Sequence, residues 1–172
     1  MSSGIEAELR NAGGALRGFE LVPGLPVEEP EFGPAWGADE LAVLRDLVGR
    51  VPEVFAAFLR DVGGISAINV GGGFASMSLT AIRQELSLEY ADALTRLKDG
   101  DTMLDVLPIG TNGSGSYFLL ACDDRGVWKF NVHMRPIARP VKVADSTRDF
   151  LSKLAEEWRA MADGEGAPYM TS

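Results

Sequence analysis

The run from Leu107 to Ala121 constrains the fold of this chain more than any other stretch. Its first part contains three glycines, which adopt backbone angles that other residues rarely reach. Its second part, Tyr117 to Ala121, is wholly aromatic or aliphatic, which is typical of a strand buried on both faces. A turn at 123–126 and a second apolar segment at 127–130 follow. We therefore predict a glycine loop that feeds a β-hairpin at the centre of an antiparallel sheet.

The glycine loop at 110–115 also raises the question of a phosphate site, because small residues let backbone N–H groups point at an anion. A P-loop needs Lys and then Ser or Thr after its last glycine, whereas Ser116 and Tyr117 follow here. A dinucleotide-binding loop leads from a strand into a helix, whereas this one leads into a strand. We favour a tight loop that sets the angle of a central strand. A nucleotide or small-molecule site at Gly110–Gly115 remains the alternative.

Apolar residues recur at helical spacing in four parts of the chain. The predicted helices cover 38–49, 52–63, 79–98 and 146–164. Strands are predicted at 103–107, 117–121, 127–130 and 141–143, with a hairpin or irregular connection at 65–77. Helices come first, strands follow, and a helix ends the chain. This order predicts an α+β fold, a single domain whose helices pack against a mainly antiparallel central sheet.

The composition divides the chain into an arm, a domain and a tail. Residues 1–37 are rich in glycine, proline and acidic residues, and we predict a partly ordered arm there. Its prolines exclude regular helix after Pro23, although a weak amphipathic helix fits the apolar spacing before it. The arm is expected to be anchored on its own domain by Phe19, Phe32 and Trp36. Residues 38–164 form the predicted domain, and 165–172 form a C-terminal tail.

Charge and composition argue against several classes of function. The net charge of −9 disfavours nucleic acid, whose phosphates would be repelled, and suits a basic protein partner. No run approaches the ~18 apolar residues of a membrane span, and the start lacks the pattern of a secretory signal. With only one cysteine, Cys122, these features predict a cytoplasmic protein. Cys122 itself is expected to be a small buried side chain.

No arrangement of residues typical of catalysis or metal binding stands out. The single histidine, His133, has no nucleophile motif beside it, so we interpret it as a surface residue. Glu85, Glu89 and Asp92 fall on the polar side of the predicted 79–98 helix, where exposure to solvent explains them better than acid–base chemistry. We therefore expect a protein that is not an enzyme and needs neither cofactor nor metal.

Three stretches carry a recognisable pattern. The clearest is LPIGTNGSGSYFLL at 107–120; the others are the helix pair around Val51-Pro52 and the segment Ala144-Asp145-Ser146 before the last helix. Together they resemble the SUKH superfamily, whose best-known branch is the yeast cell-wall assembly regulators of the Smi/Knr kind. The matching positions build the fold: Pro52, Gly63, Gly64, Pro108, Ile109, Gly110, Asn112, Gly113, Gly115 and Ser146. The arm before Trp36 lies outside the match.

The resemblance implies an α+β fold and a non-catalytic binding role. Most bacterial members are regarded as immunity proteins, which implies a cognate toxin as partner, and a basic nuclease would suit the acidic charge. The yeast branch implies the alternative, an intracellular scaffold or regulator. Candidate toxin contacts, chosen from charge and expected exposure, are Asp123, Asp124, Glu156, Glu157, Glu85, Glu89 and Asp92.

Overall fold

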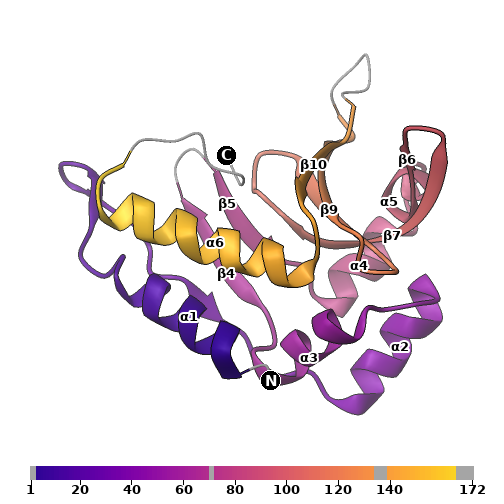
Figure 1. Cartoon of the computed structure of the whole chain (residues 1–172), viewed down its shortest axis with the longest axis horizontal. Helices are drawn as coiled ribbons and strands as arrows, with labels where there is room; N and C mark the ends of the chain where they lie inside the picture. The colour runs from indigo at the N-terminus through magenta and orange to yellow at the C-terminus, as the bar shows by residue number, and fades with distance from the viewer. Residues whose placement is uncertain (1–2, 70–71, 134–138, 166–172) are drawn as a thin grey trace.

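The chain has an α+β fold (Figure 1). The structure is a computed structural model, and it describes residues 3–69, 72–133 and 139–165. Its helices are α1 (Ser3–Gly14), α2 (Ala38–Val48), α3 (Glu53–Asp61), α4 (Leu79–Glu85), α5 (Ala91–Thr95) and α6 (Thr147–Ala162). Its strands are β1 (Glu20–Val22), β2 (Leu25–Pro26), β3 (Glu31–Phe32), β4 (Ile65–Asn69), β5 (Gly72–Ser76), β6 (Arg96–Asp99), β7 (Thr102–Thr111), β8 (Ser116–Ala121), β9 (Val127–Asn131) and β10 (Val141–Ala144).

One antiparallel sheet forms the centre of the fold, in the order β10-β9-β8-β7-β5-β4-β3, and β6 pairs with β7 off this path. The predicted hairpin is confirmed, since Leu119 of β8 lies opposite Trp128 of β9. All six residues of β8 are buried, as expected of a strand covered on both faces. The α+β prediction is therefore confirmed, with the hairpin in the interior of the sheet.

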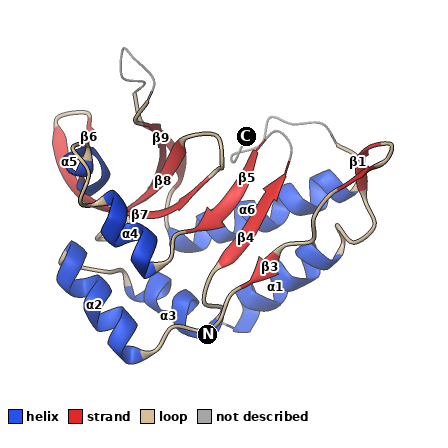
Figure 2. Cartoon of the chain, turned by 180° about the vertical axis from the view of Figure 1, so that it is seen from behind, coloured by secondary structure: helices blue, strands red, loops and turns tan. Residues whose placement is uncertain are grey.

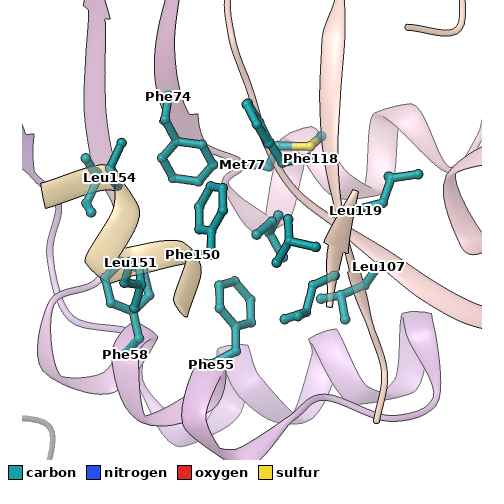
Figure 3. Packing of buried hydrophobic residues seen from close by; sticks show 14 of the residues in the cluster. Phe55, Phe58, Phe74, Met77, Leu107, Phe118, Leu119, Phe150, Leu151 and Leu154 are labelled. Carbon is teal, nitrogen blue, oxygen red and sulfur yellow. The ribbon is translucent and has the colours of Figure 1, made fainter. Parts of the chain in front are cut away.

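The helix α6 crosses one face of the sheet, and α1 lies beside it (Figures 1 and 2). Three phenylalanines meet between α6 and the sheet, one each from β5, β8 and α6: Phe74, Phe118 and Phe150 (Figure 3). Their ring centroids are 5.1–5.4 Å apart, and none is more than 1% exposed. Burial of each such side chain stabilises the fold by about 1.5–3 kcal/mol, so this cluster joins the last helix to the sheet.

The predicted helix over 79–98 is wrong. The segment forms two short helices, α4 and α5, and its last part is strand β6. The hydroxyl of Tyr90, between the helices, donates to the carboxylate of Glu85 at 2.8 Å and so holds the connection in a bend. Arg96–Asp99 then pairs with the start of β7. Leu94 and Leu97 are both buried, and their spacing also fits one face of a helix, which is why apolar spacing alone indicated one helix.

Residues 3–37, the described part of the predicted arm, pack on the rest of the chain. Leu9 of α1 and Leu16 after it are fully buried in the main hydrophobic core. Beyond residue 23 this part contains only short strands, as the prolines predict. Phe19, Phe32 and Trp36 are partly buried against the core, so the expectation that they anchor on their own domain is confirmed.

Candidate protein-binding surface

The glycine loop is shorter than predicted, because β7 continues through Gly110 to Thr111. Gly110 is required there by packing, since an added Cβ would lie 2.3 Å from the ring of Phe74. The remaining loop is organised by the buried side chain of Asn112. Its Oδ1 accepts the backbone N–H groups of Ser114 and Ser116, both at 3.0 Å.

This internal bonding bears on the phosphate alternative. The N–H of Asn112 donates to the carbonyl of Ser116 at 3.1 Å, in addition to the two N–H groups held by the Asn112 side chain. Three N–H groups of the loop are thus directed inward, and an anion would have to compete with them. The geometry favours a loop that sets the angle of the strand.

The other positions of the family-like pattern also serve the fold. Gly113 and Gly115 have φ of 76° and 94°, and Gly63 has φ of 83° after α3. Ser146 is the N-cap of α6, as predicted, and accepts the N–H of Asp149 at 3.1 Å. The remaining positions lie in the buried second half of β7, at the start of α3, or beside Gly63: Pro108, Ile109, Pro52 and Gly64.

The seven predicted toxin contacts do not form one surface. Glu156 is exposed on α6, whereas Glu157 on the same helix is only 9% exposed. The expectation that Glu157 is exposed is wrong, because this position of α6 faces the sheet. Its charge acts on Lys129 of β9, where burial lowers the pKa of the ammonium group and Glu157 opposes that shift.

The two aspartates of the β8–β9 turn have different roles. Asp123 pairs with Arg125 of the same turn at 2.6 Å; burial opposes the shift, but hydrogen bonds from Arg125 keep the pKa of Asp123 below its ordinary value. Asp124 has φ of 64°, and its carboxylate accepts the backbone N–H and the hydroxyl of Thr147. Asp124 therefore joins the turn to α6, and of the two aspartates Asp123 is the exposed one.

Glu85 is engaged inside the molecule. Its carboxylate accepts the hydroxyls of Tyr117 at 2.7 Å and Tyr90 at 2.8 Å. Burial, with hydrogen bonds to Tyr90 and Glu85, raises the pKa of Tyr117 far above its ordinary value. The exposed ring of His133 meets Tyr90 edge-on, with centroids 5.7 Å apart. This cluster connects the bend after α4 to β8, so Glu85 acts as a support rather than as an exposed contact.

Glu89 and Asp92 belong instead to an acidic lobe, residues 86–105, which includes α5, β6 and the start of β7. It lies at one end of the long axis of the molecule (Figure 1). Five carboxylates and two basic side chains give it a net charge of −3. The carboxylates are all exposed: Glu89, Asp92, Asp99, Asp101 and Asp105. None of them forms an ion pair within the described part of the chain.

The acidic lobe also carries exposed apolar side chains. Leu88 is 44% exposed and Met103 is 54% exposed, and both lie among the carboxylates in sequence. Methionine is enriched at protein-binding surfaces, whose rims are polar. Sequence reasoning missed Asp99, Asp101 and Asp105, because the helix predicted over 79–98 concealed a hairpin. The signal that was present is the Asp-Gly-Asp turn between two segments of alternating polarity.

The thiol of Cys122 is the remaining reactive group that the sequence singled out. Cys122 is buried, as predicted, and burial together with the charges of Asp105 and Asp123 raises the pKa of its thiol to about 11. No three of the described His, Cys, Asp and Glu residues are placed to hold a metal ion. Among the helices that the structure describes, none combines the length and apolar character of a membrane-spanning segment.

Comparison with known proteins adds no relative, since no protein-family model and no curated protein matches the chain.

Proposed function

We propose that this chain is a non-catalytic binding domain of the SUKH kind, a cytoplasmic immunity protein that binds a basic toxin through the acidic lobe. The observation that carries the proposal is the group of unpaired, exposed carboxylates around Leu88 and Met103. The family-like pattern at 107–120 supports the SUKH assignment, because its glycines and Asn112 occupy turn and packing positions in this fold.

The physical basis is charge complementarity. Unpaired carboxylates at the surface attract a basic surface over roughly a Debye length and so speed the encounter. Exposed apolar side chains then contribute short-range affinity once water is excluded. A nuclease fits this description, since its substrate channel must be basic to hold phosphates. An inhibitor bound there would occlude the channel without any chemistry of its own.

The test compares three forms of the full chain as baits in lysate from the native host, at low and high salt. One is the wild type. The lobe variant carries four charge-neutralising changes, Glu89→Gln, Asp92→Asn, Asp99→Asn and Asp101→Asn. The control has the same change in net charge outside the lobe, Asp46→Asn, Asp61→Asn, Glu156→Gln and Asp163→Asn. Captured proteins are identified by mass spectrometry and assayed for toxicity with and without the bait.

We expect the wild type and the control to retain one basic protein, which salt releases and whose toxic activity the bait abolishes. The lobe variant should fail to capture this basic protein. Equal capture by the lobe variant would refute the acidic lobe as the binding surface. Capture of several housekeeping proteins by wild type would refute immunity and favour the scaffold or regulator of the Smi/Knr kind.

A further inference from the structure

A cleft of about 330 Å³ lies where β3 meets the starts of β4, α2 and α4. Its apolar wall includes Phe32, Trp36 and Met77, and its charged side chains are Glu31 and Glu40. The cleft thus combines aromatic surface with negative charge, and no basic residue of the described chain lines it. Neither carboxylate belongs to the acidic lobe.

The charge of this cleft distinguishes it from two others on the molecule. A cleft between α1, α3 and α6 carries Arg60 and Arg148 together with carboxylates, and one beside Cys122 carries Arg50 and Arg125 with aspartates. In both, an arginine of the cleft pairs with one of its carboxylates: Arg60 with Glu53, and Arg125 with Asp123. In the cleft at β3, the lining residues give the two carboxylates no such compensation.

Both carboxylates are available to a ligand. Glu31 is exposed and forms no ion pair within the described residues. Glu40 uses Oε2 to accept the N–H of Gly37 at 2.8 Å, which caps α2. Its other oxygen has no bond within the described part of the chain. A cation in the cleft would therefore meet an unpaired carboxylate on β3 and a positioned one on α2.

The aromatic wall suits a planar cation. The guanidinium of Arg10 already lies over the ring of Phe32, 4.5 Å from its centroid, although Arg10 does not line the cleft. Trp36 is only partly buried, so part of its indole remains open to a ligand. Indole is the aromatic side chain that attracts cations most strongly, and a guanidinium also stacks on it.

We propose that this cleft binds the side chain of an arginine presented by a bound polypeptide. The guanidinium would stack on Trp36 and pair with Glu40 and Glu31, and its methylene groups would contact the apolar wall. The volume is at the lower end of the range for small-ligand sites, which suits one side chain rather than a nucleotide or a cofactor. This is a second binding site, separate from the acidic lobe by the length of α4, about 10 Å for its seven residues.

The test uses the full chain and the peptide acetyl-Gly-Arg-Gly-amide, with acetyl-Gly-citrulline-Gly-amide as the uncharged isostere. Backbone amide shifts of Gly33, Gly63 and Gly64, which line the cleft, are followed by NMR during each titration. Tryptophan emission is a second readout. Trp128 and Trp158 are only 2% and 3% exposed, so a ligand in solution reaches Trp36 first.

Variants connect the signal to the carboxylates. The double change Glu31→Gln and Glu40→Gln removes both charges, and the amide oxygen that it introduces at position 40 can keep the capping bond to Gly37. The matched control is Asp39→Asn with Asp46→Asn, which removes two charges from α2 outside the cleft.

We expect the arginine peptide to shift these amides and change Trp36 emission with a Kd on the order of 1 mM. The cleft variant should bind at least fivefold more weakly, and the control should bind as the wild type does. Equal shifts with the citrulline peptide, equal weakening in the control, or no shift with arginine would each overturn the proposal. None of these results depends on the partner of the acidic lobe, so this site can fail without affecting the proposed immunity function.

Discussion

The carboxylate of Asp124, in the turn between β8 and β9, accepts both the backbone N–H and the hydroxyl of Thr147, the first residue of α6. Thr147 is 1% exposed, so these bonds are largely shielded from water. One side chain therefore fastens the central hairpin to the N-terminus of the last helix, where a negative charge is also favoured by the helix dipole. This is a structural role for a residue that charge and expected exposure had suggested as a toxin contact.

Replacement of Asp124 by Ala should lower the free energy of unfolding by about 2–3 kcal/mol, because two hydrogen bonds to a charged group are lost. Denaturant unfolding followed by circular dichroism measures this. The neighbouring Asp123→Ala is the matched control, since it breaks only exposed contacts within the turn, an ion pair with Arg125 and a long bond from the Arg125 backbone N–H, and should cost less than about 1 kcal/mol. Equal losses in the two variants would contradict the role assigned to Asp124.

Gly110→Ala should destabilise the fold by roughly 1–3 kcal/mol or more, since the added methyl group would overlap the ring of Phe74 and the carbonyl of Ala75. The same unfolding assay applies. Gly14→Ala, at the end of α1 with nothing near its added methyl group, should be neutral or slightly stabilising. An unchanged free energy of unfolding in Gly110→Ala would mean that β5 and β7 are less closely packed than in the structure.

Tyr117→Phe should change how stability depends on alkaline pH. The pKa of Tyr117 is raised from its ordinary value of 10.0, so folding favours the neutral phenol. Its contribution is fully present below about pH 10 and is lost as pH rises further toward the folded-state pKa. Wild-type stability should therefore fall more steeply above pH 10 than that of the variant, as measured by urea unfolding at several pH values. Parallel curves would argue against a shielded Tyr117 phenol.

Cys122 should react slowly with a thiol reagent in the native protein. This residue is only 6% exposed and its pKa is raised to about 11, so little thiolate exists at about pH 8. Absorbance with Ellman's reagent gives the rate, and denaturant should increase it by orders of magnitude. Rapid labelling without denaturant would place this strand end at the surface.

Once the partner is known, charge reversal separates the acidic lobe from the rest of the surface. Asp99→Lys with Asp101→Lys should slow association about tenfold or more at low salt and flatten its salt dependence. Glu156→Lys with Asp163→Lys makes the same charge change on and beside α6. It should leave the association rate and its salt dependence nearly unchanged. Stopped-flow or biosensor association rates distinguish the two, and equal slowing would indicate a diffuse effect of net charge.

Much of the fold could be predicted from local sequence. The hairpin at 116–131, the cap at Ser146 and the turn glycines each follow from the chemistry of a few adjacent residues, and the structure has them. The segment 79–98 could not be predicted in this way. Leu94 and Leu97 satisfy a helix and a strand equally well, and pairing of β6 with β7 decided between them.

The candidate site shows the same division. Sequence by itself determined that the chain is acidic, that it carries a glycine loop before a buried hairpin, and that no catalytic motif is evident. Only tertiary structure decided which carboxylates remain free. Contacts between distant segments give Asp124 a hydrogen-bond partner in Thr147 and give Glu85 two tyrosine partners. Glu157 is buried against the sheet. The reason is physical: charge is a property of a residue, whereas exposure and pairing depend on what the rest of the chain brings beside it.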